Sequence, residues 1–326
     1  MTATAGQHST RSSNPRWLGA RVLFSALLIL SSGCSLWSKA RGPVPQDVAD
    51  CRKLSQRAVG ALHRGDIATA ESLAQRAVQT NPQDAQAHQF YSEALWRAGQ
   101  RDAAIAQALE AQKLLPDDPL VNVRLGEQYQ EQGRSQEAAE LASQAIDICP
   151  NCGSGWALRA RARASLGQLN ESLPDFQQAL RFQPSDQKLL LELAELHRRM
   201  NRPERALATL GSLRETYPAG EEPPQLLVLE ADAFAALQRW PQAVRARTQL
   251  AQRMPSPENW HFLATAQQQA GQHQAAQMSL AEAQRLVALG PPTQNYPDPN
   301  QVLPGTLPNL PVVPPQIARE QGNLQR

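Results

Sequence analysis

The sequence predicts an all-α chain of about seven helix pairs, because several residue types recur with one period. Prolines recur every 34 residues, at Pro82, Pro116, Pro150, Pro184 and Pro218. Seventeen residues before each proline stands a residue that readily ends a helix, at Gly65, Gly99, Gly133, Gly167 and Asn201. Glycine and asparagine tolerate the left-handed backbone that closes a helix, and proline lacks the N–H that would continue one. A constant period of this length is typical of a helical repeat array.

Small side chains mark where the two helices of each pair should touch. Twelve residues before the prolines lie Ala70, Ala104, Ala138, Ser172 and Ala206, and 24 residues before them lie Ala58, Ser92, Gly126, Ala160 and Ala194. Two positions without bulk allow antiparallel helices to approach closely. Pro255 follows Pro218 by 37 residues, which places a short insertion around residues 219–222. The array is expected over residues 51–289, in units near 51–84, 85–118, 119–152, 153–186, 187–220, 224–256 and 257–289.

The recurring positions resemble the tetratricopeptide repeat family, whose consensus orders Trp, Leu-Gly, Tyr, Ala, Phe, Ala and Pro. The third unit carries Leu125, Gly126, Tyr129, Ala138, Ala145 and Pro150 at these positions, and the fourth carries Trp156, Phe176, Ala179 and Pro184. The resemblance implies a right-handed superhelical solenoid. Four residues depart from the pattern: Arg159 and Arg163 replace Leu and Tyr, Gln238 replaces the glycine stop, and Arg247 replaces a large apolar residue.

Composition narrows the class of function. The 326 residues include 41% hydrophobic but only 5% aromatic side chains, which suits helices that meet through alanine. A net charge of +2 lacks the basic excess of a non-specific nucleic-acid binder, so no nucleic-acid partner is expected. The repeats leave no room for a catalytic domain, and the six histidines show no metal-ligand spacing. We therefore expect no enzyme activity, cofactor, metal or small-molecule substrate.

Residues 1–33 resemble a lipoprotein-type signal peptide. Arginines are the only charges before an apolar run at 22–30, which is shorter than the roughly 20 residues that span a bilayer. The Gly33–Cys34 pair resembles a lipobox, which implies cleavage before Cys34 and lipidation of that cysteine, although Ser31 stands where the family prefers leucine. Ordinary secretory cleavage and an uncleaved anchor are the alternatives. Residues 34–50 are expected to form a tether.

Two further cysteines form a C-x-x-C at Cys149 and Cys152, at the end of a unit. This position differs from the helix start at which thioredoxin-like folds place a redox pair. The candidates are a structural disulfide between Cys149 and Cys152, two free buried thiols, and redox or metal chemistry. Cys51 has no partner that the sequence reveals.

The resemblance implies that first helices line a concave side that grips a peptide. Its candidate residues are Phe90, Glu93, Trp96, Arg97, Glu127, Glu131, Arg161, Glu195, Arg198 and Asp232. One interpretation is a groove with an acidic row and an aromatic foothold at Trp96. The other is a solvated face of ordinary helix-forming residues. The Lys and Asn clamp of chaperone-binding members is absent from the corresponding positions, so that activity is not expected.

Three alternating arginines in the fourth unit are a candidate anion site. Helical geometry places Arg159 and Arg163 on one face and Arg161 on another. The alternative is that the stems of Arg159 and Arg163 pack while their charged heads reach solvent.

The final segment, residues 290–326, is rich in proline and is expected to be extended and disordered. Its apolar stretch at 307–313 is either a docking peptide or a solvated spacer. Together these features predict a lipid-anchored scaffold that binds a protein or peptide in the bacterial cell envelope, facing the periplasm or exterior. Resembling lipoproteins support secretion, pilus or outer-membrane assembly. The alternative is an accessory subunit of glycan or cell-wall machinery.

Overall fold

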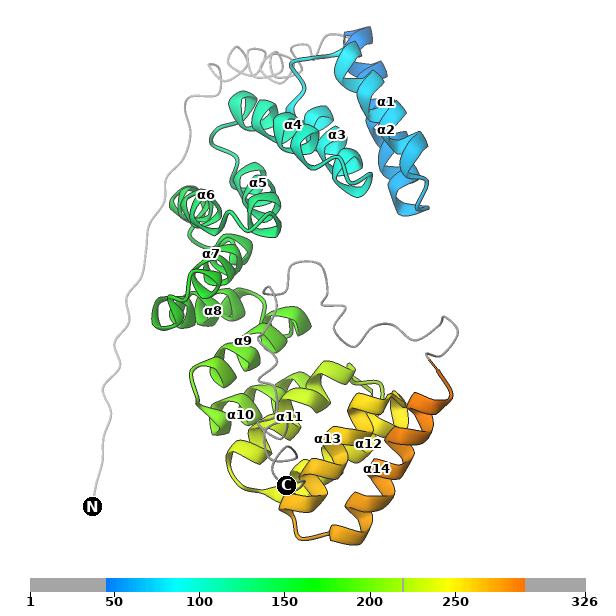
Figure 1. Cartoon of the computed structure of the whole chain (residues 1–326). Coiled ribbons are helices and arrows are strands. Elements are labelled where there is room, and N and C mark those ends of the chain that lie inside the picture. Colours follow the sequence, from blue (N-terminus) through cyan, green and yellow to red (C-terminus); the bar gives the residue numbers. More distant parts are fainter. Residues whose placement is uncertain (1–44, 219, 291–326) are drawn as a thin grey trace, which may run out of the picture. The chain divides into compact units, whose positions relative to one another are not determined.

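The computed structural model describes residues 45–218 and 220–290, and within them it contains fourteen α-helices and no strand (Figure 1). The expected signal peptide, the lipidation site Cys34, most of the tether and all but the first residue of the Pro-rich tail lie outside the described residues. The predicted all-α class and the pairing of helices are confirmed.

The helices alternate between first and second members of seven pairs. The first helices are α1 (Gln46–His63), α3 (Ala85–Arg97), α5 (Pro119–Glu131), α7 (Gly153–Ser165), α9 (Gln187–Arg199), α11 (Pro224–Ala236) and α13 (Pro257–Gln269). The second helices are α2 (Ile67–Thr80), α4 (Arg101–Leu114), α6 (Ser135–Ile148), α8 (Leu169–Phe182), α10 (Pro203–Arg214), α12 (Trp240–Arg253) and α14 (His273–Ala288). From α2 onward each helix packs against the next in the chain, and α1 shares a hydrophobic cluster with α2. In addition, α5 contacts α7, and α9 contacts α11.

The turn inside each pair is closed by a residue in the left-handed conformation. The predicted glycine stops have positive φ, for example 76° at Gly133, and Asn201 follows them at 53°. Gln238 adopts a φ of 56° at the place where the sequence departs from glycine. The position therefore dictates the backbone, whichever residue occupies it.

Replacing Gln238 by glycine should stabilise the array by about 1 kcal/mol. A left-handed L-residue costs roughly 1–2 kcal/mol, which glycine avoids, but the greater freedom of glycine in the unfolded chain offsets part of this gain. Gly133→Ala, at the same position of the third pair, is the opposite control and should destabilise. Urea unfolding followed by circular dichroism measures both. Equal midpoints for Gln238→Gly and the unchanged chain would contradict the prediction.

Three of the turns between pairs use an aspartate to begin the next helix. Asp84, Asp118 and Asp186 each accept backbone N–H bonds from the first turn, and Asp118 lies 2.8 Å from the Leu120 nitrogen. Cys152 occupies the equivalent position before α7 and makes no such side-chain bond. This turn alone of the four is held by a disulfide, between Cys149 and Cys152.

The first helix begins earlier than expected. The tether was predicted to extend to residue 50, but α1 starts at Gln46, and the Ala49 N–H donates to the Pro45 carbonyl at 3.0 Å. The early start of α1 has a local cause, since Pro45 directly precedes the helix and Asp47 in its first turn interacts favourably with the helix dipole.

Small residues form the contact inside the pairs, as predicted. Ala58, Ala70, Ala138 and Ala160 have no exposed surface. Larger side chains fill the space between successive pairs, where Phe176 of α8 clusters with leucines of α9. The core is therefore a chain of small clusters, each shared by neighbouring units.

Candidate functional site

Polar side chains link neighbouring first helices along the array. The Gln128 Nε2 donates to the Ser92 Oγ at 2.7 Å, the Arg124 Nη1 to the Gln89 Oε1 at 2.9 Å, and the Gln130 Nε2 to the Ser165 Oγ at 2.7 Å. Partners in these bonds lie 35 or 36 residues apart, about one repeat. Side-chain hydrogen bonds therefore join the first helices of pairs two to four, and these three helices carry seven of the ten predicted groove residues.

Each predicted carboxylate of the groove has a cationic or hydrogen-bonding partner from this chain. Glu93 pairs with Arg97 at 2.7 Å, and Glu195 pairs with Arg198 at 2.7 Å. Glu127 lies 3.9 Å from Arg161. Asp232 pairs with Arg247, and burial raises the pKa of Asp232 in spite of that arginine. The expected acidic row is therefore neutralised by arginines beside it, three of which (Arg97, Arg161 and Arg198) are themselves predicted groove residues.

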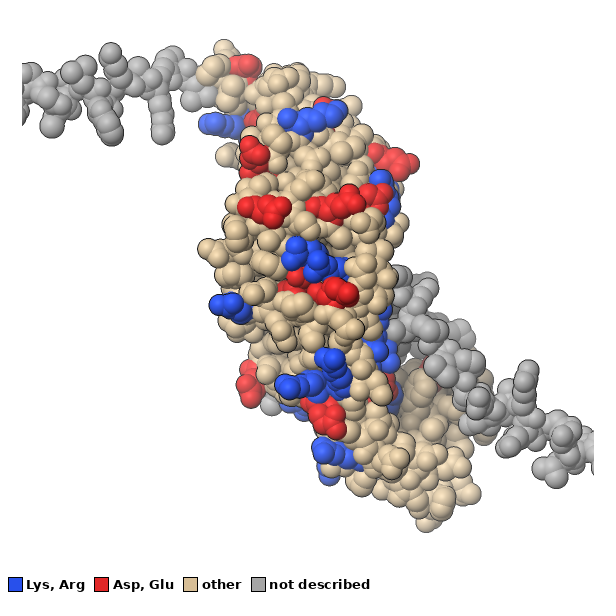
Figure 2. All heavy atoms as spheres, turned by 90° about the vertical axis from the view of Figure 1, so that its left-hand side faces the viewer, with Lys and Arg blue, Asp and Glu red and all other residues tan. Residues whose placement is uncertain are grey.

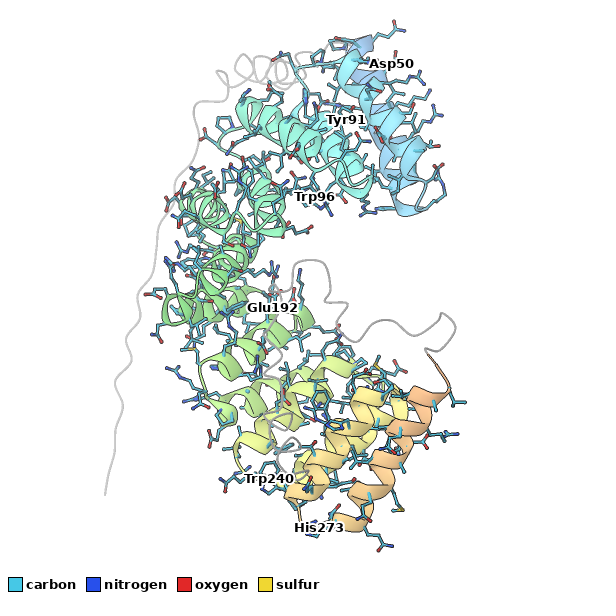
Figure 3. The ribbon with its side chains drawn as sticks, in the orientation of Figure 1. Asp50, Tyr91, Trp96, Glu192, Trp240 and His273 are labelled. Atoms are coloured by element: carbon cyan, nitrogen blue, oxygen red, sulfur yellow. A yellow bond between two sulfur atoms is a disulfide. The ribbon has the colours of Figure 1, made fainter. Side chains whose placement is uncertain are left out.

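Trp96, the predicted aromatic foothold, is labelled in Figure 3 and already has partners within the chain. Its indole Nε1 donates to the Glu131 Oε2 at 3.0 Å, and the Arg101 guanidinium lies 3.9 Å from the centre of its ring. Phe90, on the same helix, is half-buried. A partner that stacks on Trp96 must therefore displace Arg101, or bind beside it.

The guanidinium of Arg161 is not free in solvent, because it forms an ion pair with Glu192 of α9. The Arg161 Nε donates to both carboxylate oxygens of Glu192, at 3.0 and 2.8 Å. The Glu192 side chain is 4% exposed, and this burial raises its pKa although the arginine opposes the shift. Sequence reasoning missed Glu192, and the available signal was a carboxylate inside the run Leu189 to Leu193.

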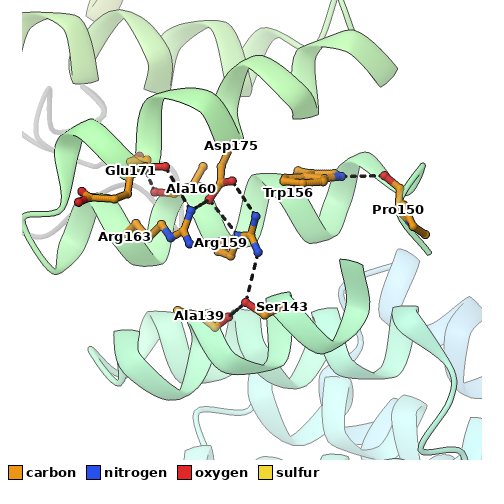
Figure 4. A network of polar contacts seen from close by, with 10 residues as sticks. Ala139, Ser143, Pro150, Trp156, Arg159, Ala160, Arg163, Glu171 and Asp175 are labelled. Carbon is orange, nitrogen blue, oxygen red and sulfur yellow. Dashed lines mark hydrogen bonds and ion pairs between the residues drawn. The ribbon is translucent and has the colours of Figure 1, made fainter. Parts of the chain in front are cut away.

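The other two arginines of the candidate anion site share one internal carboxylate, Asp175 of α8 (Figure 4). Arg159 makes two bonds to it, at 3.0 and 2.9 Å, and the Arg163 Nη1 donates to its Oδ2 at 2.6 Å. The Asp175 side chain is 3% exposed. The expectation that the heads of Arg159 and Arg163 reach solvent is therefore wrong. An anion site there would also compete with a carboxylate already in place.

Trp156 completes this region by bracing the turn before α7. Its indole Nε1 donates to the Pro150 carbonyl at 2.8 Å, and the Arg159 guanidinium lies 4.8 Å from its ring (Figure 4). The turn carries the Cys149–Cys152 disulfide. Cys51 is a free thiol without exposed surface, and burial together with Asp84 raises its pKa to about 11.

The cysteines give a prediction by mass. Denatured without reductant, the chain should take up alkylating reagent at Cys51 but not at Cys149 or Cys152, because a disulfide has no thiol to alkylate. Denatured with reductant, it should gain two further adducts. In the native protein Cys51 should react slowly, since only the thiolate is nucleophilic and its pKa is high. Equal uptake with and without reductant would mean that Cys149 and Cys152 are free thiols.

His197 of α9 predicts a pH dependence of stability. It is 7% exposed, its Nδ1 has no hydrogen-bond partner, and burial, aided by Arg202 and Arg205, lowers its pKa below 6.5. As the pH falls below 6.5, His197 binds a proton in the unfolded chain but stays neutral in the folded chain. The free energy of unfolding therefore decreases on acidification. Between pH ~8 and ~5 the unchanged chain should lose more unfolding free energy than His197→Leu. Parallel pH curves would contradict this.

Other kinds of site find no support in the described part of the chain. Within residues 45–218 and 220–290, no three His, Cys, Asp or Glu side chains are grouped so that they could hold a metal ion. None of the helices found in those ranges has the length and apolar character needed to cross a membrane. On the face shown in Figure 2, basic and acidic side chains alternate without a large region of one sign.

Comparison with known proteins gives consistent similarities. Family models described as tetratricopeptide repeat match residues 61–122 and 163–229, and a second such model matches 123–186. A relative from Xanthomonas axonopodis pv. citri, cellulose synthase operon protein C, is 29% identical over 247 residues, which are 72% of this chain and 16% of that protein.

Solved structures resemble the fold at low sequence identity. PilW, described as a widely conserved type IV pilus biogenesis factor, has a TM-score of 0.59 at 18% identity, over 63% of this chain and 94% of PilW. Pseudomonas aeruginosa PilF has a TM-score of 0.57 at 18% identity, over 64% of this chain and 94% of PilF. What these two structures share with this chain is the helix-pair fold.

Proposed function

This chain belongs to the tetratricopeptide repeat family, and on that premise we propose that it is a lipid-anchored scaffold that binds a protein or peptide in the bacterial cell envelope. Scaffolding by protein–protein contact is the role of the family. To this family role we add a membrane anchor, a location in the cell envelope and a set of groove residues. The proposed role is binding rather than catalysis.

One observation carries the binding proposal: polar side chains link successive first helices from α3 to α9, and the charges of the predicted groove residues are paired within the chain. Glu127 illustrates this, since half of its side chain is exposed while Arg161 lies 3.9 Å away. A surface of this kind attracts no strongly charged ligand from a distance. It suits an extended peptide, whose main-chain N–H and C=O groups can exchange hydrogen bonds with exposed Glu, Gln and Arg side chains.

The envelope location rests on the N-terminal segment and on two similarities. The Gly33–Cys34 pair follows a basic and then an apolar stretch. PilW is described as a pilus biogenesis factor, and the Xanthomonas relative as a cellulose synthase operon protein. Several acyl chains on Cys34 would hold the protein stably at a bilayer, whereas one chain does so only marginally.

The anchor is tested by fractionation. Cys34→Ser should move the protein from the membrane pellet to the soluble envelope fraction, because lipidation needs the cysteine sulfur. Cys51→Ser is the control and should leave the protein in the pellet. Retention of Cys34→Ser in the membrane would remove the anchor from the proposal.

Partner binding is tested by crosslinking intact envelopes and recovering the chain with its partner. Trp96→Ala and Glu127→Ala should both reduce recovery of the partner, since both lie on the first-helix surface. Glu140→Ala is the matched control, because Glu140 is an exposed carboxylate of the second helix α6. Unchanged recovery with Trp96→Ala and Glu127→Ala would assign the partner to another face.

A role in glycan machinery is the second candidate, and the name of the Xanthomonas relative favours it. The chain spans 16% of that protein, so its activity does not transfer as a whole. Sugar binding commonly needs exposed aromatic faces, and Trp96 is covered by Arg101. Titration with cello-oligosaccharides separates the candidates: binding that Trp96→Ala abolishes would favour the glycan role.

A further inference from the structure

The last helix pair leaves uncovered a position that every earlier pair buries. This position lies in the second helix, and its occupants are Ala74, Ala108, Ala142, Phe176, Leu210, Arg247 and Leu280. The five nearest the N-terminus are at most 6% exposed, and the Arg247 side chain is 12% exposed. Leu280 of α14 is 37% exposed.

The difference follows from what lies next along the array. Phe176 of α8 clusters with Leu189 and Leu193 of α9, and Leu210 of α10 clusters with leucines of α11. The first helix of the next pair therefore covers this position. No helix follows α14 in the described residues, so the side chain of Leu280 stays exposed and is available for contact with an apolar group.

Exposed apolar side chains gather on this last pair. Among the residues that the structure describes, ten large hydrophobic residues are exposed, and half of them belong to this pair or its C-cap: Phe262, Met278, Leu280, Val287 and Leu289. Terminal repeats of soluble arrays usually have a polar outer face. Leu280 and Val287 lie seven residues apart, two helical turns, and therefore on one side of α14.

We propose that residues 307–313 of this chain, which read Leu-Pro-Asn-Leu-Pro-Val-Val, bind to that side of α14. The segment lies outside the described residues, and its sequence and its attachment to α14 make it suited to this contact. Its prolines prevent an eighth helix but permit an extended peptide with apolar side chains at intervals. Four large apolar residues, at 307, 310, 312 and 313, alternate with proline and asparagine in this segment, and a spacer that stays in solvent would need none of them.

Attachment makes this segment the favoured occupant. Sixteen residues lie between Gly290 and Leu307, and at about 3.3 Å per residue they can span more than 50 Å, whereas the 16 residues of α14 measure about 24 Å. A short connection also gives a local concentration near the millimolar range. A second copy docking through α1 is disfavoured, because no large hydrophobic residue of α1 is exposed.

Hydrogen exchange of the full-length chain tests the proposal through the amides of α14. Leu307→Asp with Leu310→Asp should make them exchange about tenfold faster, as should Leu280→Lys. Two controls should change nothing: Gln301→Asp with Gln316→Asp adds the same charge outside the segment, and Met278→Lys alters an exposed residue on another side of α14. Combining the tail and Leu280 variants should add no further effect, since both remove one contact.

Two results would overturn the proposal. If the tail variant leaves exchange in α14 unchanged, the segment does not cover this helix. If protection of α14 rises with protein concentration and the mass in solution doubles, a second copy is the occupant instead. Neither result bears on partner binding at the first helices, so the two proposals fail separately.

Discussion

Asp175→Ala is expected to lower the free energy of unfolding by about 3–5 kcal/mol, because it leaves two partly buried guanidinium groups without their carboxylate. Arg159 and Arg163 both bond to Asp175, whose side chain is 3% exposed. Their remaining bonds, to Ser143 and to the Glu171 carbonyl, are long at 3.4 and 3.3 Å and involve no negative charge. Hydrogen exchange should report the loss mainly in α7 and α8, since repeat arrays open locally.

The triple variant Arg159→Leu, Arg163→Tyr, Asp175→Leu distinguishes loss of pairing from loss of packing. It restores the residues usual for the family at the first two positions, and leucine occupies the third in other units, at Leu73 and Leu141. Apolar replacement of a whole buried ion-pair cluster is often neutral or stabilising. The triple variant should therefore be about as stable as the unchanged chain. Glu137→Ala, which breaks an exposed pair with Arg134, should cost at most about 1 kcal/mol. If Asp175→Ala costs no more than Glu137→Ala, the network contributes little.

The helix pairs were predictable because local chemistry repeats at fixed positions. Glycine, proline and alanine each impose a backbone or packing condition that needs no knowledge of distant residues. The φ of 56° at Gln238 shows that neighbouring units can enforce the turn even where the residue type is lost. The start of α1 was less predictable, because helix formers at 46–50 carry no period of their own.

The polar pairs were not predictable from the period, because they depend on which side chains of different helices meet. The partners of Asp175 lie 12 and 16 residues before it, and Glu192 lies 31 residues after Arg161. No consensus position requires these charges. The arginines at 159 and 163 did depart from apolar positions, but the position of Asp175 is polar in other units too, for example at Gln107 and Thr209. The sequence therefore indicated two unusual cations without identifying the carboxylate that pairs with them.

Gly126→Val is expected to cost about 3 kcal/mol, because Gly126 of α5 lies against the side chain of Leu158 of α7. A Cβ added at Gly126 would lie 2.5 Å from the Leu158 Cδ2 and 3.4 Å from the Leu141 Cβ. Leu158 has no exposed surface, so it cannot swing into solvent. Valine adds two methyl groups to this contact and is also a weaker helix former than alanine. Urea unfolding of the full chain measures the loss.

Gly211→Ala is the matched control, since Gly211 lies inside α10 and no heavy atom stands within 4 Å of an added Cβ. It should stabilise by up to about 1 kcal/mol through helix propensity alone. The same gain is available to Gly126→Ala, so any net destabilisation there measures the cost of the crowded contact with α7. Leu158→Ala alone should cost about 2–5 kcal/mol through the cavity that it leaves. Combined with Gly126→Val it should cost less than the sum, because the valine methyls enter that cavity. Additive losses would mean that α5 and α7 do not meet at these two residues, and the pairing of adjacent first helices in this part of the array would have to be revised.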